Sequence, residues 1–187
     1  MKYISTRGQT APMDFSDVLL MGLAPDGGLM LPEHYPNIDS RTLDEWRTLS
    51  YPQLAMAIMQ RFATDIPAAD LQDIIERTYT SEVFGSDEIV PVRKLEDNLY
   101  ILGLSNGPTL AFKDVAMQFL GNAFEYVLKR KDARITIIGA TSGDTGSAAE
   151  YALRGKENIE VFMLSPHGKM SEFQRAQMYS LTDDNIH

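Results

Sequence analysis

The chain contains no cysteine and few of the side chains that bind transition metals. Its three histidines, His34, His167 and His187, lie far apart in the sequence. Disulfide bonds and thiolate metal sites are therefore excluded, and no histidine spacing is typical of a zinc site. We expect no bound metal, and the lack of cysteine favours a cytoplasmic location.

Long apolar runs and an excess of basic residues are also missing. No segment approaches the roughly 18 consecutive apolar residues that cross a bilayer, and the first ten residues lack the apolar core of a signal peptide. Lys and Arg number 17 against 26 Asp and Glu, so the net charge is −9. Such a surface does not neutralise phosphates, and we expect neither nucleic acid nor a membrane as a partner. A small anionic ligand must be held by a local group of donors.

What remains is an ordinary globular composition, 44% hydrophobic and 23% charged over 187 residues. This length suits one domain or two small ones. We predict two, residues 1–92 and residues 93–187. The first is expected to be mostly helical, with a capping box at residues 42–45, TLDE, opening one of its helices.

The second half alternates short apolar runs with helix-length segments. Runs at 99–104, 134–140 and 159–164 have the composition of strands buried on both faces, and residues 114–130 and 145–154 have helical periodicity. This alternation predicts an α/β fold with parallel strands and crossover helices. The final residues, DDNIH, are predicted to lead into another strand. Because so few strands leave apolar faces uncovered, we expect an N-terminal fragment of a longer protein.

Lys113 lies between three apolar residues and an expected helix start, in NGPTLAFKDVAMQFLG at 106–121. A lysine in such a place is most often a solvated surface charge. However, Leu110, Ala111 and Phe112 provide apolar surroundings, and the helix dipole adds positive charge beside the amine. Both effects favour the neutral amine that Schiff-base chemistry requires, although Asp114 opposes them.

A second candidate site follows the strand that ends near residue 140. The stretch IIGATSGDTGSAA, residues 137–149, runs from a buried strand into a helix, where exposed amides, the helix dipole and glycines favour an anion. It lacks the second glycine and the lysine of a nucleotide phosphate loop. The alternative is a tight turn with ordinary capping. The βαβ topology predicts that Lys113 and this loop lie at the same sheet edge.

Taken together, these stretches resemble the threonine synthase family, pyridoxal-phosphate enzymes of the tryptophan-synthase-β-like fold, fold type II. The matching segments follow in order: YISTRGQ at 3–9, LLMGLAPDGGLMLPE at 19–33, SNGPTLAFKD at 105–114, GATSGDTGSAA at 139–149 and SPHGKMSEFQRAQM at 165–178. Five ordered matches across the chain are far more specific than any single one. The resemblance implies a truncated fold type II protein. It also suggests Glu at Gly103 and Pro at Glu172, so the chain departs from the pattern there.

The resemblance also implies roles for particular residues. Lys113 is expected to form the internal aldimine with pyridoxal 5′-phosphate and then to shuttle protons. The expected carboxylate-binding loop for the substrate consists of Thr141, Ser142, Gly143, Asp144 and Thr145, with Asp144 also near the cofactor's O3′ oxygen. Lys169 would face the substrate phosphate, or is an exposed surface lysine. Ser171 and Gln174 are better explained as a capping box. Arg7 is either a contact of the site or part of a structural ion pair.

The implied reaction is that of a carbon–oxygen lyase acting on phosphates. It converts O-phospho-L-homoserine and water into L-threonine and phosphate. Because the family's cofactor-phosphate loop lies further along the chain, we expect this fragment alone to be inactive. The alternatives are another fold type II lyase acting on phosphorylated or hydroxy amino acids, and a non-catalytic module that keeps the fold.

Overall fold

The computed structural model describes residues 1–187. The chain forms two compact units, Met1–Glu76 and Arg77–His187, which are described separately. The predicted domain boundary between residues 92 and 93 stays a prediction for the longer protein. None of the helices has both the length and the apolar character that a bilayer crossing requires.

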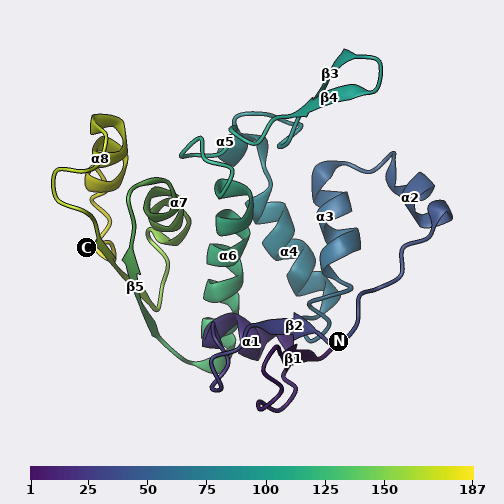
Figure 1. Cartoon of the computed structure of the whole chain (residues 1–187), viewed down its shortest axis with the longest axis horizontal. Coiled ribbons are helices and arrows are strands. Elements are labelled where there is room, and N and C mark those ends of the chain that lie inside the picture. The colour runs from purple at the N-terminus through teal and green to yellow at the C-terminus, as the bar shows by residue number, and fades with distance from the viewer. The chain divides into compact units, whose positions relative to one another are not determined.

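The first unit consists of helices and a short antiparallel ribbon, which lies beside α1 (Figure 1). The ribbon pairs β1 with β2, in a register that sets Ile4 opposite Leu31. The bounds of the elements are β1 Tyr3–Ser5, α1 Phe15–Met21, β2 Met30–Pro32, α2 Ser40–Trp46, α3 Tyr51–Met59 and α4 Ala68–Thr78, whose last two residues belong to the second unit.

Helix α2 begins earlier than the sequence pattern predicts. The side chain of Asp39 accepts a hydrogen bond of 2.8 Å from the amide of Thr42, so Asp39 is the N-cap. The predicted capping box at residues 42–45 is therefore wrong, because an acceptor three residues upstream already satisfies that amide. Thr42 lies inside the first turn instead.

Within this unit, the side chain of Asp26 connects the STRG stretch, residues 5–8, with the APDGG stretch, residues 24–28. Its carboxylate accepts hydrogen bonds from the Ser5 hydroxyl at 2.7 Å and from the amides of Gly28 at 2.9 Å and Gln9 at 3.0 Å. Burial opposes its ionisation, but these donors outweigh that effect and lower the pKa of Asp26 to about 2. The Arg7 guanidinium donates to the main-chain oxygen of Asp26 at 2.9 Å. Arg7 thus holds a loop.

The second unit contains a parallel β-α-β element. Strands β5 and β6 pair in register from Ile135 opposite Ile159 to Ala140 opposite Leu164. The elements of this unit are α5 Ser81–Phe84, β3 Val92–Glu96, β4 Leu99–Leu102, α6 Asp114–Lys131, β5 Ile135–Ala140, α7 Asp144–Leu153, β6 Ile159–Leu164 and α8 Glu172–Tyr179. Helix α7 is the crossover between β5 and β6, which confirms this part of the predicted α/β fold.

The final residues extend the parallel sheet, as predicted. Ile186 forms a parallel bridge with Val161 of β6. The amide of Val161 donates to the oxygen of Asn185 at 2.9 Å, and the amide of His187 donates to the oxygen of Val161 at 2.8 Å. One face of the sheet stays open, since Ile138, Phe162 and Leu164 are exposed.

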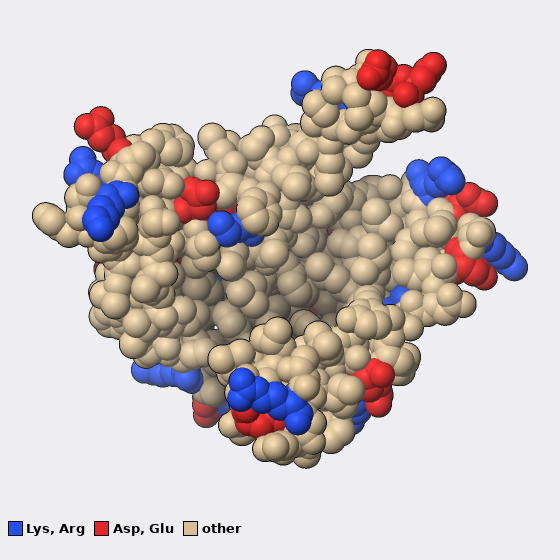
Figure 2. Space-filling view, viewed as in Figure 1, with Lys and Arg blue, Asp and Glu red and all other residues tan.

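Strand β4 does not join this sheet, which corrects the prediction for residues 99–104. It pairs antiparallel with β3, because Asn98 adopts a left-handed conformation, φ 64°, that closes a hairpin. The apolar side chains of the hairpin are exposed. In Figure 2, acidic side chains gather at its tip while much of its visible surface is uncharged.

Helices α6 and α7 pack closely, and α7 buries a carboxyl group. A Cβ placed on Gly121 of α6 would lie 2.2 Å from the carbonyl oxygen of Ala152, so glycine permits this contact.

Glu150 of α7 is 3% exposed, and its Oε2 has no hydrogen-bond partner. Burial raises the pKa of Glu150 to about 7, because the charged form is poorly solvated there.

Candidate functional site

Lys113 occupies the N-cap position of α6, where the sequence predicts a helix start. Its backbone is helical, and its side chain caps no amide of the helix. The ammonium makes no hydrogen bond or ion pair. Its Nζ lies 5.1 Å from the ring centroid of Phe112. The predicted apolar neighbours Leu110 and Phe112 are themselves largely exposed. Lys113 is therefore a half-buried amine without a polar partner beside open apolar surface.

The lysine loop, residues 107–113, carries Lys113 and is stabilised by Asp114. This side chain is fully buried and accepts two hydrogen bonds of 2.8 Å from Thr109, one from the amide and one from the hydroxyl. Burial raises the pKa of Asp114, although the Thr109 donors oppose the shift. A Cβ on Gly107 would lie 2.2 Å from the Cβ of Asp114, so the loop folds tightly over it.

Leu110 is the strained point of the same loop. Its φ is 63°, in the left-handed region that side chains other than glycine, asparagine and aspartate rarely adopt. Such strain costs about 1–3 kcal/mol and persists only where the surrounding contacts impose it. Here the buried Thr109 and Asp114 pair supplies those contacts.

The predicted anion loop runs from the end of β5 into α7. The Thr141 hydroxyl oxygen accepts hydrogen bonds from the amides of Gly143 at 3.2 Å and Gly146 at 3.1 Å. Gly143 has φ 147°, which favours glycine. Three further amides, of Ser142, Asp144 and Thr145, have no acceptor within the protein, and all three residues are exposed. They form a helix start open to an anion.

Helix α8 links this loop to the lysine loop. Nε2 of Gln174 donates to Oδ1 of Asp144 at 3.0 Å, and Nε2 of Gln177 donates to the carbonyl oxygen of Thr109 at 3.0 Å. Met178 is buried, and its methyl carbon lies 2.9 Å from where a Cβ on Gly146 would be. The lysine loop and the anion loop therefore flank the same helix. Sequence analysis missed Gln177 entirely, since a glutamine on a helix face carries no local signal.

Lys169 is not brought into contact with the other candidate residues. It lies in the turn between β6 and α8, where its amide donates to the oxygen of Pro166 at 3.2 Å. Its side chain is exposed and makes no hydrogen bond or ion pair. The capping box predicted after it is present, with the Ser171 hydroxyl accepting from the amide of Gln174 at 3.2 Å.

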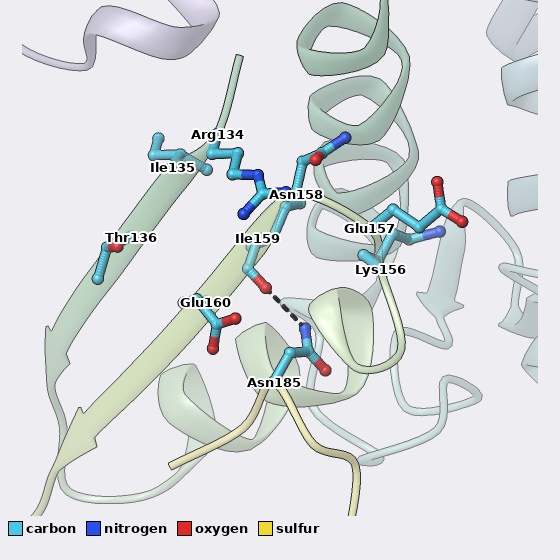
Figure 3. Close-up of a pocket in the computed structure, with 9 residues that line it drawn as sticks. All are labelled: Arg134, Ile135, Thr136, Lys156, Glu157, Asn158, Ile159, Glu160 and Asn185. Atoms are coloured by element: carbon cyan, nitrogen blue, oxygen red, sulfur yellow. Dashed lines mark hydrogen bonds between the residues drawn. The ribbon is translucent and has the colours of Figure 1, made fainter. Parts of the chain in front are cut away.

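A concave region of about 570 Å³ lies elsewhere, where β5 and β6 begin. Figure 3 shows its lining residues, with Arg134 and Asn158 near the strand starts. Asn185 donates to the oxygen of Ile159 at 3.0 Å and so closes one side of it. The candidate site, in contrast, is at the carboxyl end of β5, where open α/β sheets bind ligands.

The fold and the site together define an α/β protein in which the loop of an unpartnered amine and a helix start with unpaired amides contact the same helix. Residues 2–79 match the family described as the threonine synthase N terminus. Over its whole length the chain is 59% identical to the threonine synthase of Methylobacillus glycogenes and 55% identical to that of Corynebacterium glutamicum. It covers 41% and 40% of these relatives.

Solved structures give the same result. A crystal structure of PLP-bound threonine synthase from Brucella melitensis matches with a TM-score of 0.94 and 45% identity, over all of this chain and 40% of that one. The yeast threonine synthase structure matches with a TM-score of 0.93, 45% identity and 39% coverage of its chain. The predicted resemblance to threonine synthases is confirmed by these matches, and the chain spans about two fifths of the length of the relatives that it matches.

Proposed function

We propose that the full-length protein is a threonine synthase of fold type II. It converts O-phospho-L-homoserine and water into L-threonine and phosphate. The observation that carries this proposal is that helix α8 contacts both the loop that carries Lys113, at Thr109, and the open helix start of α7, at Asp144. Whole-length similarity to threonine synthases supports the choice of reaction.

The residues present fit pyridoxal 5′-phosphate. This cofactor needs an amine that no other group occupies, and Lys113 makes no hydrogen bond or ion pair. Lys113 would hold the cofactor covalently, with Asp144 close to it. When bound, pyridoxal phosphate acts as an electron sink that stabilises negative charge at the substrate's α carbon.

The chain's own residues position the substrate and move its protons. The unpaired amides of Ser142, Asp144 and Thr145 bind the substrate carboxylate, aided by the dipole of α7. The Thr141 hydroxyl oxygen is occupied by two loop amides, so its proton is free to donate to the carboxylate. The amine of Lys113 accepts the α proton and returns it at the end of the reaction. The exposed ammonium of Lys169 is available to the substrate phosphate.

A conservative lysine replacement tests this assignment in the full-length protein. Lys113→Arg keeps the positive charge, but its guanidinium cannot act as the reacting amine. We expect phosphate release from O-phospho-L-homoserine to fall by at least about a thousandfold, a typical size for the loss of an acid–base group. Phosphoserine and threonine serve as competing substrates. Efficient turnover of either one, with none of O-phospho-L-homoserine, would instead favour another lyase of the same fold.

Borohydride reduction distinguishes the enzyme from a non-catalytic module. After treatment of the full-length protein with pyridoxal phosphate and borohydride, peptide mapping is expected to find the label on Lys113. Labelling confined to other lysines would contradict the assignment. Lys129→Arg is the matched control, because Lys129 is exposed in the last turn of the same helix, α6.

A further inference from the structure

The side-chain amide of Gln174 makes three hydrogen bonds, which connect the start of α8 to the anion loop. Its Oε1 accepts from the amide of Ser171 at 3.3 Å and from the Ser171 hydroxyl at 3.1 Å, and its Nε2 donates to Oδ1 of Asp144 at 3.0 Å. A Cβ on Gly143 would lie 2.5 Å from the Cδ of Gln174, so the side chain also covers the loop.

The capping box fixes which end of this amide faces the loop. Ser171 presents two donors to Gln174, so the carbonyl end must point toward Ser171. A flipped amide would set N–H groups against the Ser171 donors and a carbonyl oxygen against the Asp144 carboxylate. The NH₂ group therefore faces Asp144. The Ser171 donors at the start of α8, and not the loop itself, set this orientation.

Asp144 depends on this donor for its position. It is exposed, it is the first residue of α7, and Gln174 is its hydrogen-bond partner. A carboxylate at a helix start is attracted to the unpaired amides of the first turn and to the helix dipole. Without a partner elsewhere, the Asp144 side chain would compete with an incoming carboxylate for the amides of its own loop.

We propose that Gln174 is a positioning residue that holds Asp144 away from the anion loop. The amides of Ser142, Asp144 and Thr145 then stay open to the substrate carboxylate. This inference rests on the proposed function, because it assigns these amides to the substrate. It extends the capping-box role of Gln174 to substrate affinity.

The test compares two substitutions at this position in the full-length protein. Gln174→Leu removes both the donor and the acceptor, whereas Gln174→Lys keeps a donor for Asp144 and loses the acceptor for Ser171. With O-phospho-L-homoserine, we expect Gln174→Leu to raise KM by about tenfold or more, the effect of one charge-assisted hydrogen bond, with kcat within about threefold of wild type. Gln174→Lys is expected to recover most of this loss. Gln72→Leu is the matched control, since Gln72 pairs only with Glu76 on an exposed helix face.

A double-substitution cycle shows whether the effect passes through Asp144. If it does, Gln174→Leu adds little to the KM of Asp144→Asn, because coupled residues are not additive. An unchanged KM in Gln174→Leu, an additive cycle, or a lysine variant as impaired as the leucine variant would each overturn the inference. If Gln174→Leu fails to fold, Gln174→Met, which also lacks a donor for Asp144, takes its place in the comparison and in the cycle. Wild-type protein that does not turn over O-phospho-L-homoserine would refute the proposed function instead.

Discussion

The buried carboxyl of Glu150 is expected to make stability depend on pH. Its pKa rises from 4.5 to about 7 on folding. The folded state therefore binds a proton that the unfolded state releases, so stability falls as pH rises through this window. The free-energy cost of burying the ionised carboxylate is absent below the pKa of the unfolded state and fully present above the pKa of the folded state. A shift of this size corresponds to about 3 kcal/mol, of which roughly 2.5 kcal/mol is lost between about pH 5 and pH 8.

Substitution Glu150→Gln removes this titration while keeping the shape of the side chain. We expect the free energy of unfolding of the full-length wild-type protein to fall more steeply between about pH 5 and pH 8 than that of the variant, by about 2–3 kcal/mol. Calorimetric melting of both proteins at both pH values gives the change in the free energy of unfolding with pH for each protein. The difference between these two changes is free of the cost of burying the new amide, because that cost does not depend on pH. Glu157→Gln is the control, since Glu157 is exposed. Parallel pH profiles for wild type and Glu150→Gln would refute the reasoning.

Two further substitutions test other parts of the full-length protein. Asp26→Asn removes the carboxylate that fastens the STRG and APDGG stretches, so the variant is expected to melt at a lower temperature near neutral pH. The difference should shrink as pH falls from about 4 to about 2, because the lowered pKa contributes stability only while the carboxylate stays ionised; a constant difference would contradict this. Thr141→Val removes the acceptor of two loop amides and is expected to raise KM for O-phospho-L-homoserine about tenfold. Steady-state kinetics checks this, and a KM within twofold of wild type would contradict the role of the hydroxyl.

Much of the fold could be predicted because its signals are local. The strand and helix around the anion loop follow from a buried apolar run, a glycine-rich turn and helical periodicity, and the structure places β5 and α7 there. The same kind of signal misled for residues 99–104. Their apolar composition suits a buried strand, but the turn at Asn98 pairs them with β3 instead. Composition alone does not specify the partner of a strand.

The site was predictable only in part for a related reason. Lys113 and the loop at 141–145 carry local motifs and a topology that brings them together. Gln174 contacts Asp144, 30 residues away, and Gln177 contacts Thr109, 68 residues away. The sequence near either glutamine gives no sign of these distant partners. Long-range polar contacts of this kind come from tertiary packing, which a single sequence does not reveal.

The exposed β3–β4 hairpin affects the synthesis of any longer protein that contains this chain. Its apolar side chains and open edges lie within residues 92–102, so they leave the ribosome before the later part of the chain. Open strand edges with apolar side chains promote association between chains. A nascent chain that exposes residues 92–102 is therefore prone to associate with other chains through this hairpin.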